Sequence, residues 1–381
     1  MNPPLATALD VDAPARSRAP DLLFEDVLDA RVADLGALVD DPSTVGAEDA
    51  LHRVTVFLTY RCNLACPYCK TIARTAEELA ARPQKAKTYA FEDFERLLDT
   101  HGATRIEHLH FTGGEAVTVR DLARMARRAK ERGVVRTSLT SNGTLPPERY
   151  LELVDAGIDE IRLSIDAADE AAGERFTARR GAWRRSVRTA RALGRARREG
   201  ADFFLIFNLV VTPGNRRDLP RIARFLLALG ADDLKLITEV DRARDLADFP
   251  DRERVERELA EVVAALPAER FPLLRRKLGT VFAPDSIGLD RARPVADGTW
   301  RCYVPLTERT VDAVNYYPCS VYLREGGAPL GSIDEPQDVQ RAKTAAFVAR
   351  GDCTTDPICA RYCLHCTREF NQRANDARRN T

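Results

Sequence analysis

The residues of this chain that are best suited to chemistry are its nine cysteines. Three of them, Cys62, Cys66 and Cys69, lie in the segment TYRCNLACPYCK with the spacing C-x3-C-x2-C. The other six lie between Cys302 and Cys366, and none lies between Cys69 and Cys302. Core cysteines placed at random would not segregate in this way. Without a secretory signal, metal or redox chemistry explains the two groups better than disulfides do.

The first group fits an iron–sulfur cluster. Three thiolates can bind three irons of a [4Fe–4S] cube, and the fourth iron then stays open to a substrate or a cofactor. A structural zinc site needs four ligands, often two distant C-x2-C pairs, and no histidine stands near this segment. A zinc knuckle and three unrelated core thiols are the alternatives. The spacing favours a catalytic cluster.

A repeat of strands and helices positions this cysteine segment. Six apolar stretches rich in β-branched residues alternate with amphipathic helical stretches, which predicts a parallel sheet with right-handed crossovers. The architecture is a partial barrel of six units or an open doubly wound sheet, and in both of them ligands bind at the carboxyl ends of the strands. The cysteines directly follow the first stretch. The predicted strands are 54–60, 105–113, 136–143, 160–167, 203–212 and 233–240.

Polar residues follow several of these strands. The second strand ends in HFTGGEA, where Gly113 and Gly114 let the backbone approach a ligand and Glu115 offers an anion to an ammonium group. The third and fourth strands end in TSNGT and LSIDA, and an asparagine interrupts the fifth. Ordinary strand–helix turns and a hydrogen-bonded core asparagine are the plainer explanations. The further candidates for cofactor binding are Ser141, Asn142, Ser164, Asp166 and Asn208.

The segment CNLACPYC, with Tyr68 before its third cysteine, resembles the signature of the radical S-adenosylmethionine (radical SAM) superfamily. The resemblance covers about residues 52–240 and implies an α/β fold, a partial (β/α)6 TIM-like barrel. It implies a catalytic [4Fe–4S] cluster on the three cysteines and S-adenosylmethionine as cofactor. It also implies that Gly113, Gly114 and Glu115 bind the methionine amino group, and that Ser141, Asn142, Ser164 and Asp166 bind the ribose and carboxylate. Tyr68 and Asn208 are the other candidates for cofactor binding.

The second group of cysteines resembles an auxiliary-cluster domain of this superfamily, of the SPASM or shortened twitch type. Two cysteines flank a predicted hairpin, WRCYVPLTERTVDAVNYYPCS, and four follow with the spacing C-x5-C-x3-C-x2-C. Arg350 replaces one expected cysteine, and a glycine expected before the second hairpin cysteine is absent. The resemblance therefore implies at least one auxiliary [4Fe–4S] cluster, with Cys302, Cys319, Cys363 and Cys366 as ligands. Cys353 and Cys359 are alternative ligands, or one is a hydrogen-atom donor, and a zinc site of four of the six cysteines is the alternative.

The resemblance implies reductive cleavage of S-adenosylmethionine to a 5′-deoxyadenosyl radical, which abstracts hydrogen from an unactivated carbon. Dehydrogenation, epimerisation, and elimination or decarboxylation remain open as outcomes. Only about 50 residues precede the first strand, which leaves little room for a fused leader-binding domain. We therefore expect a small polar metabolite as substrate: a sugar, aminocyclitol or nucleoside of a specialised pathway such as antibiotic biosynthesis. A ribosomal peptide substrate, and a non-enzymatic iron–sulfur or zinc protein, are the alternatives.

Composition limits the partners. Lys+Arg and Asp+Glu are both 58, so the net charge is zero and binding to nucleic acid is not expected. No apolar run reaches the roughly 18 residues of a membrane span, and no secretory signal starts the chain, so we expect a cytoplasmic protein. A flavodoxin- or ferredoxin-type protein would supply electrons. We expect an N-terminal tail with short helices at 1–50, the barrel at 51–268, a linker at 269–298, and a cysteine-rich domain at 299–381 with one obvious helix and little apolar core.

Overall fold

The structure is a computed structural model that describes residues 51–70, 77, 83–100, 106–239, 241, 245–246, 248–267, 270–283, 289, 300–350 and 352–379. The chain divides into two compact units, each built from non-consecutive segments. Among the described residues, the first unit consists of Asn63–Cys69 and 138–283, and the second contains the rest. These units do not follow the four consecutive segments expected from the sequence, which stay a prediction. The expected tail at 1–50 lies outside the described residues.

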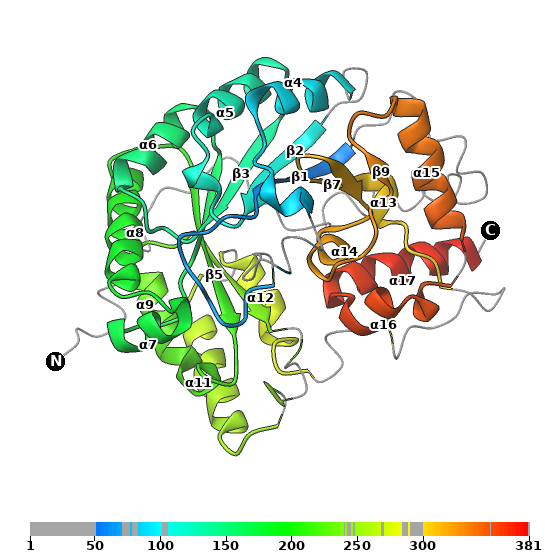
Figure 1. The fold of residues 1–381 in the computed structure, drawn as a ribbon. Helices are drawn as coiled ribbons and strands as arrows, with labels where there is room; N and C mark the ends of the chain where they lie inside the picture. The colour runs from blue at the N-terminus through cyan, green and yellow to red at the C-terminus, as the bar shows by residue number, and fades with distance from the viewer. Residues whose placement is uncertain are drawn as a thin grey trace. The chain divides into compact units, whose positions relative to one another are not determined.

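The first unit is a parallel α/β layer in which the strands have the order β6-β5-β4-β3. Helices α6, α8 and α9 cover one side of these strands (Figure 1). Prolines at 146 and 147 start α6, and Gly157, with φ of 102°, follows its end. The elements are β3 (Arg136–Ser141), α6 (Pro147–Asp155), β4 (Glu160–Ser164), α7 (Glu170–Thr177), α8 (Ala182–Arg198), β5 (Phe204–Val211), η4 (Arg216–Asp218), α9 (Leu219–Ala228), β6 (Asp233–Thr238), α11 (Arg252–Ala264) and α12 (Pro272–Leu278).

The second unit combines strands from both ends of the chain in the order β2-β1-β7-β8-β9. β1 pairs in parallel with β2 and β7, and the pairs β7–β8 and β8–β9 are antiparallel. The elements are β1 (Leu51–Thr59), η2 (Pro83–Ala86), α4 (Phe91–Thr100), β2 (Ile106–Gly113), η3 (Ala116–Thr118), α5 (Leu122–Glu131), α13 (Val304–Thr307), β7 (Glu308–Val311), β8 (Asn315–Tyr317), α14 (Ser320–Arg324), β9 (Gly331–Ser332), α15 (Gln337–Ala349), η6 (Cys353–Thr355), α16 (Pro357–Tyr362) and α17 (His365–Arg379).

The predicted fold class is confirmed, because all six predicted strands are present and the described pairs among them are parallel. The predicted hairpin is also present, with Thr310 of β7 opposite Tyr317 of β8. The expectation of one helix and little core in the last 80 or so residues was wrong. Several helices pack there (Figure 1), and Trp300, Tyr303 and Phe370 are each at most 1% exposed. Phe370 lies 67 residues after Tyr303, so the sequence pattern did not reveal that it packs with Trp300 and Tyr303.

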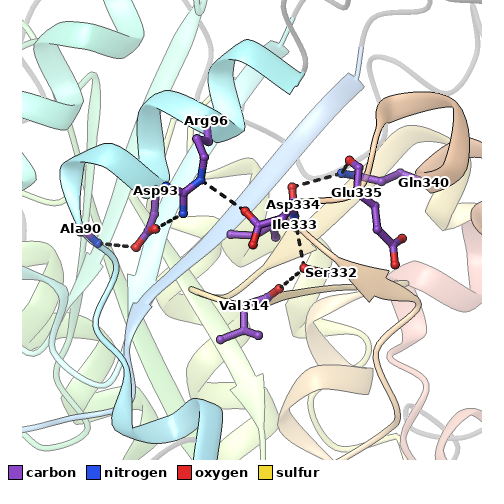
Figure 2. Close-up of polar contacts among 9 residues, drawn as sticks. All are labelled: Ala90, Asp93, Arg96, Val314, Ser332, Ile333, Asp334, Glu335 and Gln340. Carbon is purple, nitrogen blue, oxygen red and sulfur yellow. Dashed lines mark hydrogen bonds and ion pairs between the residues drawn. The ribbon is translucent and has the colours of Figure 1, made fainter.

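A polar contact joins α4 to the turn after β9 in the second unit (Figure 2). Arg96 Nε lies 3.3 Å from Asp334 Oδ1, and Arg96 also pairs with Asp93 in the first turn of α4. Gln340 of α15 donates a 2.9 Å hydrogen bond to the carbonyl oxygen of Glu335, next to that turn. The exposed ion pair adds little stability by itself, but the buried glutamine holds the first turns of α15 against the segment that follows β9.

Within the described residues, no helix combines the length and apolar character that crossing a bilayer requires.

Candidate cofactor site

In the first unit, the cysteine loop is held by its own backbone and by α7. Cys69 N donates to Cys66 O at 3.0 Å, and Ala65 N donates to Thr177 O at 3.1 Å. Leu64 is buried and anchors the loop, while the side chains of Cys66 and Cys69 are half-buried. Neither cysteine is in a disulfide. The loop therefore presents these thiols without burying them, as a cluster site requires.

Two predicted cofactor residues, Tyr68 and Asp166, meet each other. The Tyr68 hydroxyl donates to Asp166 Oδ2, and Val210 N of β5 donates to Asp166 Oδ1 at 2.7 Å. Burial raises the pKa of Asp166 to about 6, against the lowering effect of these two hydrogen bonds. Burial and the nearby carboxylate hold the pKa of Tyr68 well above its usual range. The pair fastens the cysteine loop to the carboxyl ends of β4 and β5.

A second set of hydrogen bonds also holds the cysteine loop, and it involves Asn63 and Thr144, which the sequence analysis did not identify. Asn142 donates from Nδ2 to Asn63 Oδ1 at 2.8 Å, and Asn63 donates in turn to Thr144 Oγ1 at 2.8 Å. Asn63 and Thr144 stand inside the quoted motifs CNLAC and TSNGT, so their position was the only available signal. Ser141 is buried, and its hydroxyl lies 3.0 Å from the Tyr150 hydroxyl and accepts from Gly143 N. Asn142 and Ser141 thus have structural contacts at the end of β3.

The predicted residues Ser164 and Asn208 keep polar atoms available. Ser164 ends β4, and its register partner Asn208 lies three residues before the end of β5, so both side chains point to the same face of the sheet. Asn208 is 6% exposed, and its Oδ1 has no hydrogen-bond partner among the described residues. A buried acceptor without a partner costs free energy, about 1–3 kcal/mol, unless a ligand or water supplies a donor. This pair fits a polar cofactor group.

In the second unit, the Gly-Gly-Glu turn packs on the chain that leads into Cys62. Gly114 N donates to Thr59 O at 2.6 Å, and Glu115 N donates to Arg61 O at 2.9 Å. A Cβ atom on Gly113, whose φ is 143°, would clash with Thr59 O. One on Gly114 would clash with Arg61 O. The glycines therefore permit a close approach of two protein segments, in addition to any approach to a ligand.

Glu115 is completely buried at the start of η3. Its Oε1 accepts a 3.1 Å hydrogen bond from Val117 N, which makes it the N-cap of that short helix. One carboxylate oxygen is therefore oriented by the backbone. Buried carboxylates are stabilised by cationic or hydrogen-bonding partners, and the ammonium group of S-adenosylmethionine is a partner of this kind. Its role as ammonium ligand stays a prediction.

The C-terminal cysteines gather around one apolar cluster in the second unit. Cys302, Cys353 and Cys363 are at most 9% exposed and belong to this cluster, and Cys319 and Cys359 pack against it. The side chain of Cys366 lies outside the described residues. No three described His, Cys, Asp or Glu side chains converge enough to hold one metal ion.

Hydrogen bonds and burial affect the thiols of the C-terminal cysteines that are predicted to bind the auxiliary cluster. Cys302 Sγ accepts from Asn371 Nδ2 at 3.3 Å, and Cys319 Sγ accepts from Tyr322 N at 3.4 Å. Burial raises the pKa of Cys319 to about 11, so the thiol is neutral at pH 7 until a metal binds. A hydrogen bond from Cys359 lowers the pKa of Cys353, and the partner thiol is correspondingly held protonated.

Cys353 and Cys359, our alternative ligands, thus touch each other. The negative charge of Cys353 also raises the pKa of Cys302, after the larger effect of burial. The alternative pair therefore lies near a hairpin cysteine. Arg350, at the position of the missing cysteine, pairs with Asp356 at 2.9 Å. The assignment of ligands among these six cysteines stays a prediction.

Residues 56–226 match the family model described as the radical SAM superfamily. These residues form a radical SAM domain. Such a domain implies a [4Fe–4S] cluster and S-adenosylmethionine, and the half-buried thiols and the open Asn208 acceptor fit them. Over these residues the predicted family is confirmed, and with it the predicted cofactors, while the residues that bind them remain predicted.

Curated relatives are similar to part of this chain. A PqqA peptide cyclase of Granulibacter bethesdensis is 33% identical over 175 residues, which cover 46% of this chain and 43% of the relative. A PqqA peptide cyclase of Bradyrhizobium diazoefficiens is 28% identical over 186 residues, which cover 48% of this chain and 45% of the relative. The match thus spans less than half the length of these relatives.

Two solved structures share the fold of the chain. Streptococcus suis SuiB bound to precursor peptide SuiA gives a TM-score of 0.56 at 14% identity, covering 93% of this chain and 75% of SuiB. Native anSMEcpe with bound AdoMet and Cp18Cys peptide gives a TM-score of 0.56 at 15% identity. The match covers 86% of this chain and 99% of anSMEcpe. At these identities the likeness shows the fold alone.

These names correct our expectation about the substrate. We expected a small polar metabolite, whereas the relatives are named as peptide cyclases, and SuiB and anSMEcpe are described with bound peptides. The expectation of a small-molecule partner is therefore wrong, and none of these names supports antibiotic biosynthesis. The error came from the length of the chain before the first strand, which says nothing about the substrate that the barrel binds.

Proposed function

We propose that this chain is a peptide-modifying radical SAM enzyme. The observation that carries the proposal is the 33% identity to a PqqA peptide cyclase over 175 residues. It stands beside the match of residues 56–226, which contain the cysteine loop, to the radical SAM family. The structural neighbours described with bound peptides support it. A cytoplasmic location stays a prediction.

In this proposal the chain's own residues hold and position the cofactors. Cys62, Cys66 and Cys69 bind the catalytic cluster, Glu115 binds the methionine ammonium group, and Ser164 and Asn208 bind other polar groups of S-adenosylmethionine. When bound, this cofactor pair supplies a 5′-deoxyadenosyl radical for hydrogen abstraction from a substrate carbon. Tyr68 and Asp166 hold the loop in place, because their hydrogen bond joins it to two strand ends.

For the reaction, we propose a net two-electron oxidation of the peptide, such as ring closure. One hydrogen atom leaves the abstracted carbon, and a second electron and a proton leave as the new bond forms. An oxidation of this kind needs a one-electron acceptor, and an auxiliary iron–sulfur cluster held by the C-terminal cysteines belongs to the right chemical class.

The proposal is tested by anaerobic reconstitution of the full chain with iron and sulfide. After S-adenosylmethionine and dithionite are added, we expect 5′-deoxyadenosine by chromatography. Candidate precursor peptides encoded beside the gene are then added, and we expect one to lose two hydrogen atoms by mass spectrometry. Formation of 5′-deoxyadenosine without any peptide modification, but with turnover of sugars or nucleosides, would overturn the peptide assignment.

A further inference from the structure

One face of the strands β1, β2 and β7 in the second unit is unusually polar for a buried surface. On β2, the Phe111 ring packs against Phe94 of α4, with ring centroids 5.8 Å apart. Side chains alternate along a strand, so His108 and His110 point to the face away from α4. Their rings lie 6.2 Å apart, edge to face.

The parallel register places residues of β1 and β7 on the same face of the sheet as these histidines. Arg53 is the register partner of both His108 and Glu308, and Thr55 is the partner of both His110 and Thr310. We call these six residues the polar face. Arg53, His108, His110 and Glu308 are each no more than 8% exposed. Four ionisable side chains are thus removed from water on one sheet.

The hydrogen-bonding capacity of Arg53 is not used up within the described residues. Its only ion pair there joins Nη1 to Glu308 Oε1 at 3.9 Å, too long for a hydrogen bond, and its buried Nε has no hydrogen-bond partner. A purely structural layer of buried charge is normally paired and fully hydrogen-bonded, because unmatched groups destabilise the fold. An open guanidinium fork suggests that a ligand completes the site.

The charge of the polar face indicates the kind of ligand. Arg53 is always positive and an ionised Glu308 is negative, so their formal charges cancel, and each histidine adds zero or one positive charge. The formal sum therefore lies between zero and +2 and does not become negative. With either histidine protonated the sum is positive and favours an anion, and a guanidinium fork matches a carboxylate with two parallel hydrogen bonds.

The polar face lies on the strands that lead to the candidate site. His110 precedes Gly113 by three residues, about 10 Å along the strand. At the other side, the charge of Glu308 is among the causes that raise the pKa of Cys319, a predicted auxiliary ligand. The His110 end of the polar face is therefore the end nearer to the Gly-Gly-Glu turn, whereas Arg53 lies six residues before Thr59, about 20 Å along β1.

We propose that the polar face binds a carboxylate-bearing side chain of the peptide substrate, with Arg53 as the main contact and His110 as the second donor. This inference rests on the proposed function and adds a specificity-determining site to it. A substrate residue of aspartate or glutamate type is then selected over its amide.

Two small probes test the proposal on the reconstituted full chain. N-acetyl-glutamate methylamide and N-acetyl-glutamine methylamide differ only in the charged group, and their dissociation constants are measured by calorimetry without reductant. We expect the glutamate probe to bind roughly tenfold or more tightly than the glutamine probe, because a site built for a hydrogen-bonded group discriminates against its analogue. Arg53→Gln should bring the ratio close to one, and Arg53→Lys should leave an intermediate ratio.

Arg309→Gln is the matched control. Arg309 is buried on the same strand as Glu308 but on the opposite face, where it donates to Gln340 at 2.9 Å, so the glutamate preference should persist. If Arg53→Gln fails to fold, the double variant Arg53→Gln/Glu308→Gln removes both charges and should also lose the preference. Equal binding of both probes to the wild type, or an equal loss in Arg309→Gln, would overturn the site. Because no reductant is present, this result is independent of whether the chain cleaves S-adenosylmethionine.

Discussion

At the scale of single residues, the strand-end positions divide by what their side chains already contact. Asp166 and Asn142 hold the cysteine loop through Tyr68 and Asn63. Ser164 and Asn208 sit side by side, and the buried amide oxygen of Asn208 has no partner among the described residues. The first pair therefore positions the cluster ligands, and the second pair remains available to the cofactor itself.

Glu115 has two roles in this scheme, which substitution can separate. Glu115→Gln keeps an oxygen that can accept from Val117 N but removes the charge that would bind an ammonium group. We expect S-adenosylmethionine to bind about 10–100-fold more weakly, since a hydrogen bond to a charged group contributes about 1.5–3 kcal/mol. Equilibrium dialysis of the reconstituted protein measures this. Glu115→Ala should in addition lower the thermal midpoint, because the cap is lost.

Iron content is the control for both variants and should stay at the wild-type value. Unchanged affinity in Glu115→Gln would mean that the carboxylate serves only as a cap for η3.

The catalytic cysteines give a second prediction at this scale. The triple variant Cys62→Ala/Cys66→Ala/Cys69→Ala should make no 5′-deoxyadenosine, because the loop would hold no iron. Its C-terminal cluster should remain, since those cysteines have an apolar core of their own. Chromatography and an iron assay measure the two effects. Cofactor cleavage by the triple variant would move the catalytic cluster elsewhere in the chain.

At the scale of elements, Asp233 joins β6 to α12. Its carboxylate is fully buried and accepts from the backbone N–H groups of Leu273 and Leu274, at 2.8 and 3.1 Å, in the first turn of α12. Leu234 N donates as well, at 2.7 Å. An aspartate from a distant strand thus supplies the cap that α12 lacks locally.

This cap predicts a pH dependence. Burial raises the pKa of Asp233 from 3.8 to about 7, more than the backbone hydrogen bonds lower it. Because the folded-state pKa lies above the unfolded one, folding favours the protonated form. The contribution of Asp233 to the free energy of unfolding is complete below about pH 4, and it is lost as pH rises through 7. The change is on the order of a few kcal/mol.

Asp233→Asn should remove this pH dependence of stability. At low pH the variant should be less stable than the wild type, because the amide has one acceptor oxygen fewer. The difference in thermal midpoint between wild type and Asp233→Asn should therefore shrink as pH rises from about 5 to 8. Parallel curves for the two proteins would show that Asp233 does not titrate in this range.

The elements also show how far the sequence could be interpreted. Long apolar strands alternating with amphipathic helices predicted β1 to β6 within a few residues. The parallel pairing of β7 with β1 was not predictable, because β7 is four residues long, reads ERTV, and lies about 250 residues from its partner. The cysteine loop and strand-end residues followed from motif and position. The contacts of Asn63, and the polar face around Arg53, depend on register and became visible only in three dimensions.

At the scale of the whole molecule, the number of iron–sulfur clusters determines how many electrons the protein can hold. One catalytic and one auxiliary [4Fe–4S] cluster predict about eight irons per chain, and two auxiliary cubes would predict about twelve. Six C-terminal thiolates are too few for two complete four-cysteine clusters, which favours the lower number. Colorimetric iron analysis of the reconstituted wild type, with protein quantified by amino-acid analysis, measures it.

Serine variants then assign the auxiliary ligands. Cys302→Ser should lower iron to about four per chain, and serine can still accept from Asn371 Nδ2. Because Trp300, Tyr303 and Phe370 form a core of their own, the segment should stay folded, as limited proteolysis would show. Cys353→Ser should keep iron near eight if Cys363 and Cys366 complete the cluster. A drop to about four in Cys353→Ser would instead make Cys353 a ligand, as its closeness to Cys302 allows. About four irons in the wild type, with zinc bound, would remove the electron acceptor on which the proposed peptide oxidation depends.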